Sequence, residues 1–208
     1  MALIVRKSKS LSDKEKTMRT ILLLLLTMMA CWSCDPMSNY RREMAKELAT
    51  GERHDSLFLG IYLGMPAKDF FGHCWQLNKQ GLVKEGPQNA SVQYVLGELK
   101  SPGKMYFYPD FHEDKIHKMR LTFSYDAWAI WNKEMYSDKL IQDLIRIFER
   151  WYGGEFMEIK SKKGHSVFVH IDGNRRISLW IKDDMLVRGL ITDMSIDQGD
   201  KKNNNVLD

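Results

Sequence analysis

The densest group of side chains that could do chemistry lies in Tyr108–His117, "YPDFHEDKIH". Imidazole and carboxylate groups bind divalent metals and act as the acids and bases of hydrolytic enzymes, and Asp110, His112 and His117 are the candidates here. The two histidines are five positions apart, which would place them on opposite faces of one strand, and Glu113-Asp114 between them predicts a hairpin tip. A metal-dependent or His/Asp hydrolase is therefore the alternative functional hypothesis. A solvated turn is the simpler interpretation, and no metal or other cofactor is predicted.

A second reactive pattern is the C-x-x-C formed by Cys31 and Cys34. A thioredoxin-type C-x-x-C lies between a strand and the helix it precedes, where the helix N-terminus lowers the thiol pKa. Here the pattern follows the apolar run Ile21–Ala30 and precedes Asp35-Pro36. The sequence therefore does not predict a redox centre. Cys74 is the remaining cysteine, and three cysteines are too few for a disulfide framework.

The N-terminal segment has the pattern of a secretory signal. As a helix, Ile21–Ala30 would span about 15 Å, whereas the hydrocarbon core of a bilayer is about 30 Å thick. Basic residues between Arg6 and Arg19 precede this run, and the small residue Ala30 ends it. We assign residues 1–30 to a signal peptide, with Met18 as an alternative start because "MRTILLLLLTMMA" is a complete signal by itself.

The sequence Thr27–Cys31, "TMMAC", resembles the lipobox of bacterial lipoproteins. In that family the peptidase cuts before the cysteine, whose sulfur carries diacylglycerol with acyl chains such as palmitate. The resemblance implies lipidation of Cys31, with Cys34 as the alternative acceptor; Met28 stands where leucine is commoner in the family. It also implies a bacterial cell-envelope protein that an N-terminal lipid attaches to a membrane, on the periplasmic or outer-surface side.

The charge of the chain belongs mostly to the segment that would be removed. Residues 1–30 hold six Lys/Arg and two Asp/Glu of the 31 and 27 in the chain, so residues 31–208 carry 25 of each sign. A nucleic-acid-binding protein needs a basic excess for the phosphate backbone. The mature chain is close to neutral, and nucleic acid is therefore not a predicted partner.

Hydrophobic periodicity predicts the secondary structure. One helix follows Pro66 and ends at Gly81, and a second covers Ser137–Tyr152, with Ser137 as its N-cap and Gly153 as its stop. Period-two alternation or short apolar runs predict the strands Leu57–Leu63, Ser91–Leu99, Lys104–Tyr108, Lys115–Tyr125, Phe156–Lys160, Ser166–Ile171, Arg175–Ile181 and Met185–Ile196.

This order, βαβββ-αββββ, predicts the α+β class. We expect an antiparallel sheet of about seven to eight strands, with the two main helices packed on one face and a partly polar opposite face exposed to solvent. The two halves look like one architectural unit used twice. The predicted domains are 31–55, a lipid anchor and polar tether; 56–197, a single globular domain; and 198–208, a disordered tail. Within the tether, a short helix with Tyr40, Met44 and Leu48 on one side is the alternative to a flexible linker.

The stretch "GIYLGMPAKDFF", Gly60–Phe71, resembles the strand–Gly-Met–helix opening of small lipoproteins of the outer-membrane-assembly type. Their domains are similar in fold to the secreted β-lactamase-inhibitor proteins, which pair helices with an antiparallel sheet. Pro66 stands where these families have Ser or Thr. The resemblance implies a binding module of the cell envelope without catalytic residues.

Two regions could contact a partner. The connection Tyr125–Tyr136 carries Trp128 and Trp131, which could anchor a ligand or, alternatively, cap the core. Arg120 and Thr122 alternate with apolar residues and so point to the polar face of the sheet, where Trp180 is a further candidate. Trp75 is expected in the core.

The sequence thus predicts a lipid-anchored, non-enzymatic envelope protein that binds another envelope protein or component. The lipid would attach it to the membrane. No cofactor is predicted, and the sequence does not name the partner.

Overall fold

The computed structural model describes Met18 and residues 36–87, 91–161 and 164–197. The predictions for the signal peptide, for Cys31 and Cys34, and for the tail 198–208 lie outside the described residues. Among the described residues, no helix is both long enough and apolar enough to cross a bilayer.

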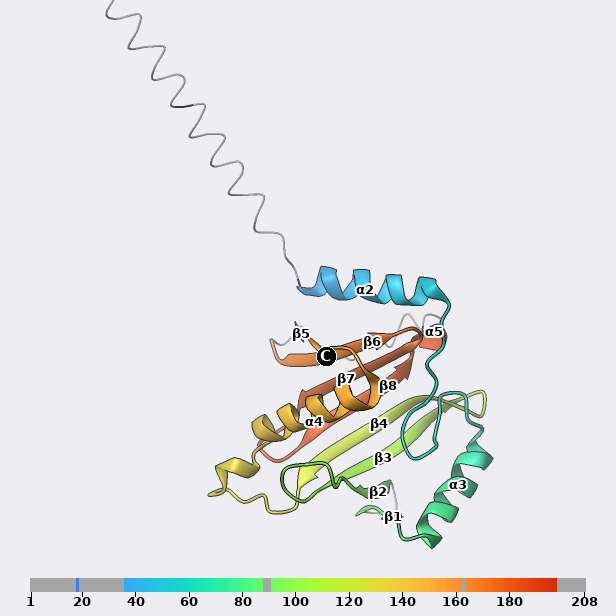
Figure 1. Cartoon of the computed structure of the whole chain (residues 1–208), viewed down its shortest axis with the longest axis vertical. Helices are drawn as coiled ribbons and strands as arrows, with labels where there is room; N and C mark the ends of the chain where they lie inside the picture. Colours follow the sequence, from blue (N-terminus) through green and yellow to red (C-terminus); the bar gives the residue numbers. More distant parts are fainter. Residues whose placement is uncertain (1–17, 19–35, 88–90, 162–163, 198–208) are drawn as a thin grey trace, which may run out of the picture. The chain divides into compact units, whose positions relative to one another are not determined.

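The described residues form one antiparallel sheet with helices, which confirms the predicted α+β class (Figure 1). The sheet has eight strands in the order β1-β2-β3-β4-β8-β7-β6-β5. The strands are β1 (Val83–Glu85), β2 (Val92–Val95), β3 (Gly103–His112), β4 (Lys115–Tyr125), β5 (Met157–Lys160), β6 (Ser166–Asp172), β7 (Arg175–Ile181) and β8 (Val187–Asp193). The helices are α2 (Pro36–Thr50), α3 (Ala67–Lys79), the 3-10 helix η3 (Lys133–Met135), α4 (Ser137–Tyr152) and α5 (Met194–Asp197).

The sheet consists of two similar halves. In each half one helix precedes a four-stranded meander, α3 before β1 to β4 and α4 before β5 to β8. The two meanders join where β4 pairs antiparallel with β8, with Leu121 opposite Gly189. This arrangement agrees with the prediction of one architectural unit used twice.

Helix α4 covers the middle of one face of the sheet, against β4, β7 and β8 (Figure 1). Its apolar stripe packs on the sheet because residues three and four apart lie on one side of a helix. Leu144 and Phe148 are fully buried, and the Phe148 ring lies 5.9 Å from that of Phe123 on β4. Helix α3 contacts β1, and its Phe70 and Leu77 belong to the same hydrophobic core.

The predicted strand Leu57–Leu63 is wrong, and the order therefore lacks its first strand. Leu59 and Gly60 have φ values of 53° and 78°, so the chain turns sharply here instead of extending. Leu57, Ile61 and Leu63 are all buried, which explains the continuous apolar run without a strand. The sequence reading also missed β1, whose three residues are too short to show a period.

Two further boundaries differ from expectation. Residues 36–50 form the helix α2, which is the alternative that we gave to a flexible linker. Ser137 is the first residue of α4 and not its N-cap; Tyr136 occupies the cap position without a side-chain cap, and the Ser137 amide donates to the Asp184 carbonyl instead.

Candidate functional site

Helix α4 covers one face of the sheet, and in the residues that the structure describes the opposite face is largely without a helix in its centre. Phe123 points towards α4, so its neighbour Thr122 and the residues in register with Thr122 point to the opposite side. We call the strand side chains opposite α4 the open sheet face. Arg120, Thr122 and Trp180, which the sequence predicted as contacts, all lie on this face.

The two faces differ in the sign of their net charge, since the strand residues on the α4 side hold four carboxylates and two cations, Lys160 and Arg175. In the regularly paired part of the sheet, the open sheet face has one carboxylate, Asp110, and six cationic side chains: Lys84, Lys104, Lys118, Arg120, Arg176 and Arg188. The other strand carboxylates lie on the α4 side: Glu85, Glu158, Asp172 and Asp193. Tyr106, Tyr108 and Trp180 accompany the cations. A chain whose residues 31–208 carry equal numbers of both signs therefore has one cationic sheet face.

The exposed centre of the open sheet face runs across β3, β4, β8 and β7. The Arg120 side chain is 70 % exposed, and its Nε donates to Asp110 Oδ2 at 2.8 Å. Next to it, the Arg188 guanidinium donates to Thr122 Oγ1 at 2.8 Å. Trp180 is the neighbour of Arg188 on β7. The structure thus places the predicted Thr122 and Trp180 on either side of Arg188 in one row across three strands.

One end of this face is covered. Arg176 is buried, and its guanidinium donates to the hydroxyl of Tyr40 in α2 at 3.0 Å. Ser178 and Thr192 are also buried there, and their hydroxyl oxygens have no partner among the described residues. The part of the face that can meet a partner is therefore the β3–β4–β8 region with Trp180.

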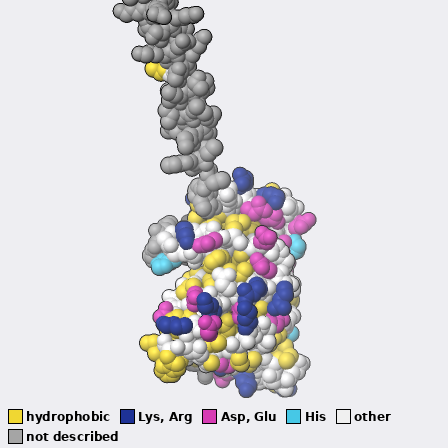
Figure 2. All heavy atoms as spheres, turned by 60° about the vertical axis from the view of Figure 1, so that its left-hand side comes forward, with side chains coloured by type: hydrophobic (Ala, Val, Ile, Leu, Met, Phe, Trp, Pro, Cys, Tyr) yellow, Lys and Arg dark blue, Asp and Glu magenta, His cyan; other side chains and the backbone are white. Residues whose placement is uncertain are grey.

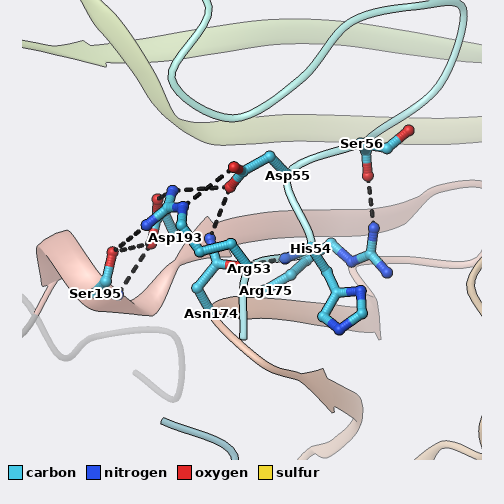
Figure 3. Close-up of polar contacts among 8 residues, drawn as sticks. All are labelled: Arg53, His54, Asp55, Ser56, Asn174, Arg175, Asp193 and Ser195. Carbon is cyan, nitrogen blue, oxygen red and sulfur yellow. Dashed lines mark hydrogen bonds and ion pairs between the residues drawn. The ribbon is translucent and has the colours of Figure 1, made fainter. Parts of the chain in front are cut away.

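A polar cluster fastens the segment after α2 to the second half of the sheet (Figure 3). Arg53 donates to both carboxylate oxygens of Asp55, to Asp193 Oδ2 at 2.9 Å and to Ser195 Oγ. Asn174 joins the same cluster, because its side chain donates to Asp55 and accepts from the His54 amide. We call these residues the Arg53 cluster.

Gly173 and Arg175, at the β6–β7 turn, allow the segment after α2 to approach the sheet closely. Gly173 lies directly under the crossing segment, and a Cβ at this position would lie 2.6 Å from the Glu52 carbonyl oxygen. Buried Arg175 then donates to the Ser56 carbonyl at 2.6 Å and stacks on the Tyr152 ring. The role of the cluster is structural, because its polar groups form hydrogen bonds with one another and so hold the segment after α2 against the sheet.

Asp193 is the buried charge of this cluster, with no exposed side-chain surface. Burial alone would raise the pKa of its carboxyl, but hydrogen bonds from Ser195, Arg53 and Asn174 outweigh burial, and the pKa is lowered. The carboxylate is therefore ionised at neutral pH, and its charge depends on these donors.

The candidate metal or hydrolase residues separate into two groups. The rings of His112 and His117 lie 5.6 Å apart, because the turn at Glu113-Asp114 folds the hairpin back. The hairpin tip predicted at Glu113-Asp114 is therefore confirmed, and the two histidines belong to the adjacent strands β3 and β4 instead of to opposite faces of one strand. Asp110 pairs with Arg120 instead of joining them. In the described part of the chain, no three His, Cys, Asp or Glu side chains are grouped closely enough to hold a metal ion.

The two tryptophans of the β4–α4 connection have different surroundings. Trp128 is half-buried, its Nε1 donates to the Asp184 carbonyl at 3.1 Å, and its ring lies 6.1 Å from that of Tyr136. Trp131 is 83 % exposed. Trp75, expected in the core, is 56 % exposed on α3, with Lys79 Nζ 3.4 Å from the ring centroid.

A cleft of about 560 Å³ lies beside α4. Its buried carboxylate is Asp143, which accepts a hydrogen bond from the Tyr125 hydroxyl at 2.7 Å and pairs with Arg146. Burial and the bond to Asp143 raise the pKa of Tyr125, so the phenol stays neutral. The Asp143 carboxylate in this cleft is thus bonded to groups of the protein itself, the Tyr125 hydroxyl and the Arg146 guanidinium.

Arg188 is the site residue that sequence reasoning missed. The strand Met185–Ile196 was predicted too long, so its alternation was not followed residue by residue. The pattern was present: Arg188 and Leu190 alternate with Val187, Gly189 and Ile191, which face α4. Reading that alternation would have placed Arg188 on the same face as Thr122.

Comparisons with protein-family models, with curated proteins and with solved structures found no match to this chain. The function must therefore be inferred from the surface itself. Figure 2 shows one side of the molecule, where Lys and Arg side chains lie among Asp, Glu and hydrophobic ones.

Proposed function

We propose that this chain is a lipid-anchored, non-enzymatic protein of the bacterial cell envelope that binds an acidic protein partner through its open sheet face. The observation that carries the proposal is the charge of the uncovered β3–β4–β8 region, where four cationic side chains, Lys104, Lys118, Arg120 and Arg188, accompany one acidic side chain, Asp110. Complementary charge selects partners and accelerates their association.

The chemistry of the face suits a protein surface. Tyr108 is 39 % exposed and Trp180 is half-buried, so both can contribute apolar contact area at the centre of an interface. Arg188 hydrogen-bonds a hydroxyl and no carboxylate among the described residues, so its charge is available to a partner. Arg120 can exchange its exposed pair with Asp110 for a partner's carboxylate at little cost, because exposed ion pairs contribute little stability.

The anchor is proposed from the sequence. The lipobox-like Thr27–Cys31 follows a basic and then apolar segment, which supports export and lipidation at Cys31. The mass of the mature N-terminus tests this directly. We expect a diacylglycerol-bearing Cys31; Cys31→Ser should abolish the added mass, whereas Cys34→Ser should leave it unchanged. An unmodified chain that begins elsewhere would overturn the anchor.

Binding is tested with the acidic polypeptide poly-L-glutamate as the probe, using the full chain in detergent. The Arg120→Glu/Arg188→Glu variant should bind the probe at least about tenfold more weakly, and wild-type binding should weaken with salt because the contacts are ionic. The matched control is Lys139→Glu/Arg150→Glu, which makes the same charge change on exposed positions of α4. Equal losses in both variants would show attraction by net charge alone and would contradict a site on the open sheet face.

Crosslinking from the face identifies the natural partner. A photoreactive residue in place of Tyr108 should capture one envelope protein in cells, and one in place of Glu149 on α4 should not. If only the photoreactive residue at position 149 captured a protein, the binding site would lie on the α4 side, and the proposed site on the open sheet face would be wrong.

A further inference from the structure

The connection between β4 and α4 ends in two exposed apolar side chains. Ile130 is 69 % exposed and Trp131 is 83 % exposed, and they are neighbours in the chain. In Figure 1 this connection projects at the lower left, beyond the end of α4. A single exposed apolar residue needs no explanation, but two adjacent large ones, Ile and Trp, present a continuous apolar surface to the solvent. We call Ile130 and Trp131 the tip.

The backbone behind the tip is already hydrogen-bonded. The Asn132 amide donates to the Ala129 carbonyl at 2.8 Å, and the Asn132 side chain donates to the Ala127 carbonyl. The Tyr136 hydroxyl donates to the Ile130 carbonyl at 2.8 Å. A carbonyl that has a partner within the loop loses little when water is removed from it.

The base of the loop is fixed as well. Trp128 donates to the Asp184 carbonyl in the β7–β8 connection, and its ring packs near that of Tyr136. Lys133 Nζ donates to the Tyr136 hydroxyl at 2.7 Å, and its charge lies 4.0 Å from the centroid of that ring. The tip is therefore presented by a preformed loop, and binding would not have to order it.

We propose that the tip inserts into the interface of a lipid bilayer and sets the orientation of the domain at the membrane. Trp and Tyr favour the water–hydrocarbon interface, where an apolar ring can be buried while its polar group stays hydrated. The Ala129 and Ile130 carbonyls are already hydrogen-bonded within the loop, so this part of the backbone loses little at a bilayer, which offers no hydrogen-bond groups of fixed geometry.

This inference rests on the proposed function for its premise that the domain is held at a membrane. A lipid anchor raises the local concentration of bilayer around the tip, so two side chains are enough for a useful contact. The charges next to the tip include Lys133 and Glu134, so an anionic lipid is not required.

The test uses the full chain reconstituted in phosphatidylcholine vesicles that contain brominated lipids, which quench the fluorescence of tryptophan in the bilayer. Trp131→Phe should remove a quenched component of the emission. Trp75→Phe, the control at another exposed tryptophan, should remove an unquenched one. If both substitutions remove an unquenched component, the tip does not enter the bilayer and the proposal is overturned.

A second measurement gives the strength with which the chain binds to vesicles. Chain added to preformed phosphatidylcholine vesicles should be released at least about fivefold more readily when both tip residues are changed, Ile130→Ser/Trp131→Ser, a difference near 1 kcal/mol. Trp75→Ser should leave release unchanged, and an equal effect would contradict the tip. Vesicles with about one fifth anionic lipid should give the same ranking. Because the mass of the N-terminus reports the anchor independently, a failed anchor and a failed tip give different results.

Discussion

The guanidinium of Arg53 donates to the fully buried carboxylate of Asp193, 140 positions later in the chain, across 2.9 Å. In the same cluster the Asn174 side chain donates to Asp55, and the Ser195 hydroxyl donates to the second carboxylate oxygen of Asp193. A buried charge is tolerated only where hydrogen bonds replace the water that it loses. The attachment of the N-terminal arm to the sheet therefore depends on a small number of polar contacts.

Replacing Arg53 should destabilise the domain. Arg53→Ala leaves Asp193 buried with fewer donors, so we expect the free energy of unfolding to fall by about 1–3 kcal/mol. Urea denaturation followed by circular dichroism measures this change. Arg150→Ala, at an exposed arginine of α4, should change the free energy of unfolding by less than about 0.5 kcal/mol. Equal effects of the two substitutions would show that the Asp193 contact contributes nothing specific.

Asp193 should also make stability fall in acid. Its pKa in the folded state is lowered, so its contribution is complete above the unfolded pKa, about 4, and is lost as the pH falls through the lower folded value. Asp193→Asn should therefore be less stable at pH 7 and lose less stability than wild type between pH 4 and pH 2. Urea midpoints at several pH values measure the slope. Asp138→Asn, an exposed carboxylate, provides the reference; a slope unchanged in Asp193→Asn would be the contrary result.

Gly189 should not accept a side chain. It lies in the central strand β8 beneath α4, and a Cβ there would lie 3.0 Å from Leu179 and 3.1 Å from Leu121. Gly189→Ala should therefore overpack the core and cost about 1–3 kcal/mol of unfolding free energy. Gly72→Ala in α3 is the matched control, because no atom lies within 4 Å of a Cβ at that position. Gly72→Ala should gain about 0.5–1 kcal/mol through helix propensity.

Cys74 should react slowly with thiol reagents in the folded protein. Burial raises the pKa of its thiol to about 11, so the reactive thiolate is scarce at pH 8. In the Cys31→Ser/Cys34→Ser chain, labelling should accelerate about tenfold per pH unit between pH 8 and pH 10. Denaturation should also accelerate it. Labelling at equal rates in the folded and denatured chains would contradict the half-buried position of Cys74.

Local pattern predicted much of the fold. The Ser137–Tyr152 helix and the Arg175–Ile181 strand match the structure residue for residue, because a continuous apolar stripe or alternation ends at a clear turn signal. The strand predicted at Leu57–Leu63 was wrong because the apolar residues of this segment are buried around a tight turn. A short run of buried apolar residues has the same sequence pattern in a turn as in a buried strand.

The candidate site was predicted in part for the same reason. Alternation placed Arg120 and Thr122 on the polar face, and the structure adds Arg188 between Thr122 and Trp180. Which strands are neighbours depends on β4 pairing with β8, and nothing local specifies that pairing. The Arg53 cluster was unpredictable for the stronger reason that its members come from opposite ends of the domain.

The position of Arg53 and Asp193 also bears on how the protein is made. A ribosome completes the segment that carries Arg53 long before it reaches β8, so the contacts of Arg53 with Asp193 and Ser195 are the last of this segment to form. The contacts of the same segment with Asn174 and Arg175 become possible earlier, once β7 has emerged. A chain that ends before β8 would therefore hold this segment by fewer contacts, in a state that proteases can distinguish from the finished protein.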